Sequence, residues 1–167
     1  DLINEFFEIT RFNLSNITLK YSDINLTRLL EQLIYEFNPM LKEKNLQCVL
    51  HSAKDIMLHC DANKMQRVFD NLLRNAAIYS YSDTEITITT ELRANKVTIV
   101  FENCGANIPE EKLEQIFEQF YRVDTARSMA NGGAGLGLAI AKHIVELHKG
   151  TIAAKSKDEC VKFIVEL

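Results

Sequence analysis

The chain has 167 residues, 47% of them hydrophobic, and a formal net charge of −4. This length suits one domain with a short attached segment. No stretch approaches 18 apolar residues and no basic patch is present, so we expect neither a membrane nor a nucleic acid as a binding partner of this chain. The four cysteines form no CxxC or Cys/His cluster, which argues against a zinc site.

The first 20 residues are predicted to be the end of a helix and a linker. Leu2, Phe6 and Ile9 have helical spacing. Because the chain opens on Asp1 and shows no signal peptide, we expect it to be a fragment of a longer protein. The short stretch from Ser22 to Asn25 is predicted to be a polar junction.

Asn25 is a good N-cap for a helix whose apolar residues run from Leu26 to Leu41, and Pro39 is expected to kink this helix or end it early. Asp61 caps a second helix, which is predicted to reach about Tyr79. The other predicted elements are strands at 47–51, 56–60, 85–92, 96–101, 151–155 and 160–167, a helix start at Pro109, and a helix over 136–148 closed by Gly150.

The order of these elements predicts an α+β fold of two layers. The strands at 85–92 and 96–101 alternate apolar and polar residues and are joined by a short turn, which indicates a hairpin with one buried face. We therefore expect a mixed, mostly antiparallel sheet with helices packed on one face. The domain is expected to span 21–167.

The glycines are unevenly distributed along the chain, because four of the six fall within 132–137. The spacing fits neither a Walker A loop, since Leu138 stands where the lysine belongs, nor a Rossmann fingerprint. A helix follows directly, and free N–H groups at a glycine-rich helix start bind phosphate. The alternative is a flexible hinge without a ligand. Residues 121–135 lack an apolar period and are interpreted as a mobile loop.

Three further segments carry polar or aromatic residues in unusual places. Asn71 and Asn75 are four apart at the margin of an apolar helix face, which fits either Mg²⁺ ligands or surface amides that cap backbone. Asn103 follows a buried strand, where it could accept from an exocyclic amine or stand in an ordinary turn. Phe117 and Phe120 fit core packing, whereas Arg122 and Arg127 are cations able to reach a phosphate.

In this order and spacing the segments resemble the ATP-binding catalytic domain of bacterial sensor histidine kinases, which has the Bergerat-type fold shared with gyrase-like ATPases. The matching segments are NLLRNA with Tyr79 (N box), NCGANIP (G1 box), IFEQFYRVD (F box) and GGAGLGLAIAKHIVELHKG (G2 box). The start, LINEFFEITRF, resembles the end of a dimerisation-domain helix. Together with NLTRLLEQLIYEF it is most similar to VanS-type sensors of vancomycin resistance.

The resemblance implies ATP and Mg²⁺ as ligands. Asn75 matches the Mg²⁺ ligand, Asn71 a phosphate-side partner, and Asn103 the adenine-reading position. Residues 121–135 match the ATP lid, in which Arg122 approaches the γ-phosphate. The other implied site residues are Tyr79, Gly105, Ile108, Phe120, Tyr121, Arg127, Gly133, Gly135, Leu136 and Gly137.

The resemblance also implies partners. We expect transfer of the γ-phosphoryl group to a histidine on a dimerisation domain, and onward relay to a response regulator. None of the four histidines here has the acidic residue that usually follows the acceptor histidine. The whole protein is expected to be a homodimeric plasma-membrane sensor with this domain in the cytoplasm.

Four departures from the family pattern are visible. Asn103 replaces an aspartate, Asn107 a glycine, Ile78 a lysine and Ala134 a threonine. Asn103 predicts weaker adenine binding, because a neutral acceptor is weaker than a charged one. We expect the site to differ first at Asn107. Two alternatives stay open, namely a gyrase-like (GHKL-type) ATPase and a degenerate nucleotide-binding or interaction module.

Overall fold

The computed structural model describes residues 18–52, 55–94, 96–123 and 135–167. The predicted helix end at 1–17 and the central part of the predicted loop, 124–134, lie outside this range. The described elements are β1 (Ser22–Asn25), α2 (Leu26–Glu43), β2 (Gln47–His51), β3 (Met57–Cys60), α3 (Ala62–Tyr79), β4 (Glu85–Arg93), β5 (Lys96–Cys104), the 3₁₀ helices η1 (Glu110–Lys112) and η2 (Gln115–Phe117), α5 (Gly137–Leu147), β6 (Thr151–Lys157) and β7 (Cys160–Glu166).

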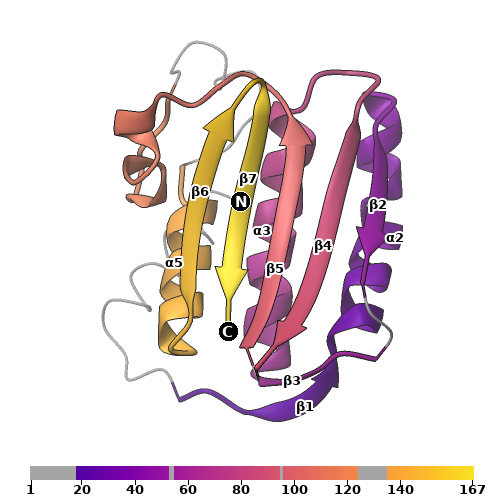
Figure 1. Cartoon of the computed structure of the whole chain (residues 1–167), viewed down its shortest axis with the longest axis vertical. Helices are drawn as coiled ribbons and strands as arrows, with labels where there is room; N and C mark the ends of the chain where they lie inside the picture. The colour runs from indigo at the N-terminus through magenta and orange to yellow at the C-terminus, as the bar shows by residue number, and fades with distance from the viewer. Residues whose placement is uncertain (1–17, 53–54, 95, 124–134) are drawn as a thin grey trace.

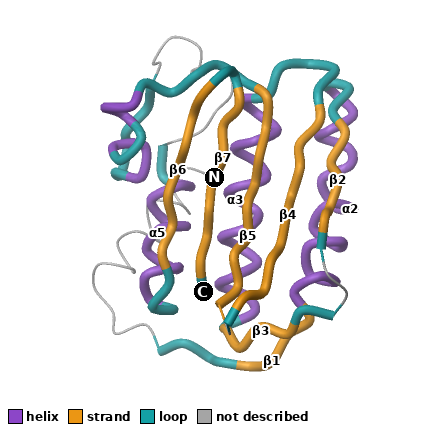
Figure 2. Tube along the Cα trace, viewed as in Figure 1, coloured by secondary structure: helices purple, strands orange, loops and turns teal. Residues whose placement is uncertain are grey.

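Five strands form one sheet in the order β2-β4-β5-β7-β6. The β2–β4 pair is parallel, and the other three pairs are antiparallel. The helices α2, α3 and α5 lie together on one face of this sheet (Figures 1 and 2). This arrangement confirms the predicted two-layer fold with a mixed, mostly antiparallel sheet. None of the described helices is both long enough and apolar enough to cross a bilayer.

The core fills the space between the sheet and the helices. Along β5 the inward positions Val97, Ile99, Phe101 and Asn103 are buried, whereas the positions between them are partly or fully exposed. The rings of Phe69 on α3 and Phe101 stack with centroids 6.0 Å apart. The polar Asn103 therefore stands on the core side of its strand, in line with aliphatic and aromatic side chains.

Pro39 does not end α2, which continues to Glu43 as one helix. The side chain of Asn25 caps its start, accepting from the N–H of Arg28 at 3.0 Å. Pro39 itself is exposed, so the carbonyl that loses its intrahelical partner is on the solvent side. Phe37 and Leu41 on the other side remain buried, and this burial holds the helix together past the proline.

Two other predicted segments differ from the structure. The expected polar junction at Ser22–Asn25 is the strand β1, which pairs antiparallel with β3 and places Ile24 opposite Leu58. This pairing joins segments more than 30 residues apart, which a local pattern does not reveal. After Pro109 the chain forms the short turns η1 and η2 rather than a full helix, since only Ile116 and Phe117 there are buried.

Asp61 and His148 fix the relative position of α3 and α5. The Asp61 carboxylate caps α3 by accepting from the N–H of Lys64 at 3.1 Å, and it also accepts from the N–H of Lys20 at 2.9 Å. Burial alone raises the pKa of Asp61, but these donors outweigh burial and hold the pKa below its usual value. The N–H of Asp61 donates to Nε2 of His148 at 3.0 Å.

Candidate functional site

The predicted segments are neighbours along the second half of α3. In Figure 1, α3 and β5 end at the upper edge, whereas α5 begins lower down, beside the middle of α3. Asn71 on α3 lies close to the first residue of α5, because a Cβ placed on Gly137 would stand 3.2 Å from Asn71 Oδ1. The N-box and G2-box segments are therefore neighbours, although Asn71 and Gly137 are more than 60 positions apart in the sequence.

Two buried side-chain nitrogens in these segments lack a hydrogen-bond partner, and within the described ranges they are the only such side-chain atoms. They are Nδ2 of Asn71 and Nδ2 of Asn103, both predicted site residues. Asn103 is 2% exposed. Leaving a buried amide without a hydrogen-bond partner costs about 1–3 kcal/mol of stability. A polar ligand that bonded to either amide would remove this cost.

Asn75 lies one helical turn beyond Asn71 and is half-buried. The apolar face of α3, with Leu72 and Ala76, is packed in the core, so the two asparagines stand at its margin as predicted. An asparagine amide offers one hard oxygen and two N–H donors. The oxygen suits Mg²⁺, and the N–H groups suit phosphate oxygens.

The turn after β5 packs directly against the end of α3. A Cβ on Gly105 would lie 2.5 Å from the carbonyl oxygen of Tyr79 and 3.3 Å from Asn103 Nδ2. Gly105 also forms a β-bridge with Ser80, and the N–H of Tyr81 donates to the backbone carbonyl oxygen of Cys104 at 2.9 Å. Only a residue without a side chain fits here, which explains the glycine of this motif. The Tyr79 side chain itself is 51% exposed.

Lys44 contributes to this edge although the sequence pattern does not single it out. Its ammonium donates to the carbonyl oxygens of Ala77 at 3.2 Å and Ser80 at 3.5 Å, and also to that of Ile78. Burial lowers the pKa of Lys44. Lys44 thus caps the last turn of α3 from outside the helix, on either side of Tyr79. No local signal reveals it, because the contact spans more than 30 residues.

The two ends of the predicted lid meet at Phe120 and Gly135. The N–H of Phe120 donates to the carbonyl of Gly135 at 3.0 Å. Both residues have left-handed backbone, with φ of 63° and 73°. Tyr121 and Arg122 follow at once and are half-buried, and Leu136 is buried beside Gly135. The predicted site residues Arg127 and Gly133 lie outside the described residues.

The start of α5 is a candidate position for binding phosphate. Leu136 occupies the N-cap position, and its side chain makes no capping hydrogen bond. The first N–H groups of a helix have no partner within the helix and carry partial positive charge, so they bind anions. Gly137 keeps this end free of a Cβ next to Asn71.

Asn107 and Ile108 are held by the turn between β6 and β7. Asn107 Oδ1 accepts from the N–H of Glu159 at 2.9 Å and from Ser156 Oγ at 3.4 Å. Ser156 Oγ in turn accepts from the N–H of Ile108 at 2.9 Å. The asparagine that replaces a glycine thus has a structural role, since its side chain fastens the G1 segment to this turn.

We expect Gly135→Ala to destabilise the domain by roughly 1–3 kcal/mol. The new Cβ would sit 2.9 Å from the carbonyl oxygen of Tyr121, at a φ that side chains rarely adopt. Urea unfolding of the variant and the parent measures the difference. An unchanged free energy of unfolding would show that the contact between Phe120 and Gly135 does not hold the base of the predicted lid.

The sequence is similar to those of known proteins. Residues 60–167 match the family described as histidine kinase-, DNA gyrase B- and HSP90-like ATPase. The chain is 50% identical to the sensor protein VanS of Enterococcus faecium over 99% of its own length and 43% of that protein. It is 47% identical to the sensor protein VanSC of Enterococcus gallinarum, covering 46% of that protein. The chain therefore spans less than half the length of these relatives.

Among solved structures, histidine kinase ThkA in complex with the response regulator protein TrrA superposes with a TM-score of 0.84. The two chains are 27% identical, and the match covers 99% of this chain and 46% of that one. The fold is therefore the fold of a histidine kinase catalytic domain.

Proposed function

We propose, because the chain belongs to the family of histidine kinase-, DNA gyrase B- and HSP90-like ATPases, that residues 21–167 are the ATP-binding catalytic domain of a sensor histidine kinase. One observation carries the proposal. Of the two unpartnered buried amides, that of Asn71 lies beside the start of α5, and that of Asn103 lies beside Gly105 at the end of α3. This arrangement suits a ligand with phosphates at one end and a polar ring at the other.

Asn103 is assigned to the adenine side. Its amide oxygen can accept a hydrogen bond from the exocyclic amine of adenine. Gly105 beside it leaves the backbone accessible to a flat ring. Tyr79 and Ile108 are the neighbouring side chains assigned to contact the nucleotide.

Asn71, Asn75 and the start of α5 are assigned to the phosphate side. The described residues hold no group of three His, Cys, Asp or Glu side chains able to bind a metal ion. Mg²⁺ accepts one protein ligand together with phosphates and waters, so the Asn75 amide oxygen fits it. The ion supplies neutralisation of phosphate charge when bound. The N–H groups of Gly137 and its successors, with Arg122, hold the phosphate oxygens.

A kinase is favoured over a hydrolytic ATPase by the chemistry of Asn71. In gyrase-like ATPases this position carries a glutamate that takes a proton from the attacking water, and an amide cannot do so. The phosphoryl group is therefore kept for another nucleophile, which we propose is a histidine of the dimerisation domain. Positioning and charge neutralisation are sufficient for such a transfer.

We further propose that the whole protein is a homodimeric plasma-membrane sensor that relays phosphate to a response regulator in glycopeptide resistance. The identity to VanS and VanSC supports the resistance pathway. The similarity to a histidine kinase solved with a response regulator supports the relay.

Radiolabel transfer tests the kinase proposal. This chain, mixed with γ-labelled ATP, Mg²⁺ and a folded dimerisation domain, is expected to label that domain on histidine and to remain unlabelled itself. The matched control replaces the acceptor histidine by glutamine. Absence of label in the mixture, although the chain binds ATP, would contradict the kinase and favour a binding module. Rapid release of inorganic phosphate by the chain alone would favour an ATPase.

Asn103→Asp is expected to bind an ATP analogue several-fold more tightly than the parent and to melt at a lower temperature. A charged acceptor strengthens the bond to the adenine amine, whereas an unpaired buried charge destabilises the unliganded domain. Calorimetric titration and thermal unfolding measure the two effects. Asn63→Asp, an exposed change near the far end of α3, is the matched control. Equal or lower affinity of Asn103→Asp would contradict the assignment of the adenine side.

A further inference from the structure

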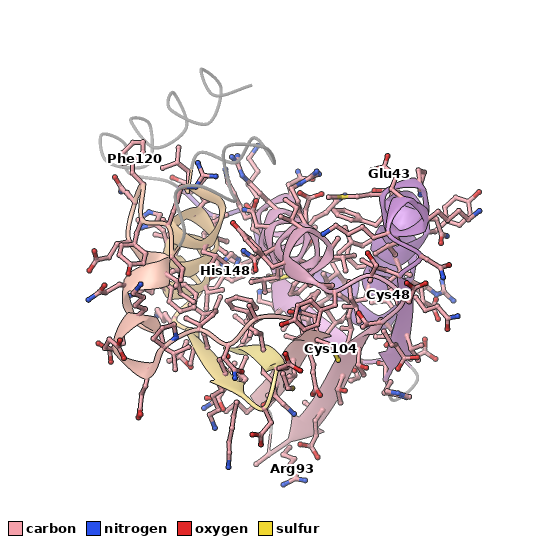
Figure 3. The ribbon with its side chains drawn as sticks, turned by 90° about the horizontal axis from the view of Figure 1, so that it is seen from above. Glu43, Cys48, Arg93, Cys104, Phe120 and His148 are labelled. Carbon is pink, nitrogen blue, oxygen red and sulfur yellow. The ribbon has the colours of Figure 1, made fainter. Side chains whose placement is uncertain are left out.

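Cys104 and Cys160 face each other across two neighbouring strands. They are register partners in the antiparallel β5–β7 pair. Asn103 points to the core, so Cys104 and its partner lie on the opposite face of the sheet, away from the helices. Figure 3 shows Cys104 in the strand layer, separate from the helices.

The backbone pattern sets the separation of the two cysteines. The backbones of Val97 and Leu167 exchange two N–H···O bonds of 2.9 Å. The N–H of Gly105 donates to the backbone carbonyl oxygen of Glu159 at 2.9 Å. Hydrogen-bonded and non-hydrogen-bonded pairs alternate along an antiparallel ladder, so Cys104 and Cys160 form a non-hydrogen-bonded pair. The Cα atoms of such a pair are about 4.5 Å apart. This distance lies within the range that a disulfide spans.

The other two cysteines are differently placed. Burial raises the pKa of Cys48 to about 12 and that of Cys60 to about 11, and neither faces another cysteine across its strand pair. Cys104 is exposed and Cys160 is half-buried. The chain therefore contains one accessible, pre-aligned pair and two thiols that serve as internal controls.

The thiol of Cys160 is held in place by its neighbours. Its S–H donates to Glu102 Oε1 at 3.2 Å, and Glu102 is paired with Lys162 at 2.6 Å. Burial raises the pKa of Cys160, and the Glu102 carboxylate and Cys104 raise it further. Cys104, the exposed partner, is therefore the thiol that reacts first.

We propose that Cys104 and Cys160 form a reversible disulfide by exchange with a low-molecular-weight disulfide. The Cys104 thiolate attacks that disulfide, forms a mixed disulfide and releases one small thiol. Cys160 then loses its proton to water and attacks the Cys104 sulfur, which releases the second small thiol. Two protein thiols are oxidised to one disulfide, and one small disulfide is reduced to two thiols.

The bond would act next to the proposed adenine side. Cys104 stands between Asn103 and Gly105. The backbone of Gly105 packs so closely against the carbonyl of Tyr79 that a Cβ there would clash with it. A disulfide brings the two Cβ atoms to about 3.8 Å, closer than the 4.5–5.5 Å of an ordinary cross-strand pair. The shift is transmitted to Asn103 and Gly105, so the oxidised domain is expected to bind an ATP analogue several-fold more weakly. This second step rests on the proposed function.

Peptide mapping tests the disulfide. The folded chain is incubated with oxidised glutathione, free thiols are alkylated, and a non-reducing digest is analysed by mass spectrometry. We expect a peptide pair linked through Cys104 and Cys160, with Cys48 and Cys60 alkylated. The link should persist in Cys48→Ser/Cys60→Ala and be replaced by glutathionylated Cys104 in Cys160→Ser. Glutathionylated Cys104 without a link in the parent chain, or no reaction, would overturn the proposal.

Titration of the oxidised and reduced chain with a non-hydrolysable ATP analogue tests the coupling. Cys160→Ser, treated in the same way, controls for other effects of glutathione. Equal affinities of the linked and reduced forms would refute the coupling. Failure of the reduced chain to bind the analogue would instead refute the proposed function and leave the peptide mapping of the disulfide unaffected.

Discussion

Replacing Asn75 by alanine is expected to lower the Mg²⁺-dependent affinity for an ATP analogue roughly tenfold to a hundredfold. Changes to residues that support a bound metal ion commonly cost this much in metal affinity, and here the proposed ligand itself is removed. Asn75 is half-buried and alanine favours helix, so the fold should tolerate the change. Calorimetric titration with and without Mg²⁺ measures the effect, and the variant should lose most of its response to the ion.

The matched control for this prediction is Asn63→Ala. Asn63 is exposed in the first turn of the same helix, about three turns before Asn75. The control should bind the analogue like the parent. If Asn75→Ala also binds like the parent and responds equally to Mg²⁺, Asn75 is not the metal ligand and the phosphate side must be reassigned.

Gly105→Ala should both destabilise the domain and weaken nucleotide binding. The added Cβ would lie 2.5 Å from the carbonyl oxygen of Tyr79, so either the turn after β5 or the end of α3 must move. Overpacking of this kind costs about 1–3 kcal/mol. Because Asn103 lies within 3.3 Å of the new atom, we expect the affinity for the analogue to fall about tenfold or more.

Gly150→Ala separates the two effects of that substitution. A Cβ on Gly150 would lie 2.4 Å from the carbonyl oxygen of Glu166, a clash of similar severity, but Gly150 precedes β6 at the opposite edge of the domain (Figure 1). Urea unfolding should show both variants destabilised, and only Gly105→Ala should lose affinity at a temperature where both are folded. Equal affinities for the two variants would place the nucleotide away from Gly105.

Local periodicity was sufficient to predict much of the fold. The alternation along β4 and β5 predicts their hairpin, and the apolar face of α3 predicts which side is buried. The errors arise where distant segments decide the outcome. β1 exists because β3 offers it a partner, and α2 continues past Pro39 because Phe37 and Leu41 are buried against the rest of the domain. Neither fact is contained in the local sequence.

The candidate site was likewise predicted only in part from the sequence. Motif spacing singled out Asn71 and Asn103, and both carry the buried amide nitrogens that lack a partner. Spacing could not reveal that Asn71 abuts Gly137, that Lys44 caps α3, or that Asn107 is bound to the turn before β7. Each of these contacts joins residues more than 30 positions apart, so only the folded chain brings them together.

Titration of this chain with a non-hydrolysable ATP analogue, in the presence and absence of Mg²⁺, tests the proposed ATP site most directly. We expect saturable binding of one nucleotide per chain, tighter with Mg²⁺ than without it, and displacement by ADP. The absence of saturable binding at millimolar nucleotide with Mg²⁺, in a chain shown to be folded, would contradict an ATP site around Asn71, Asn75 and Asn103.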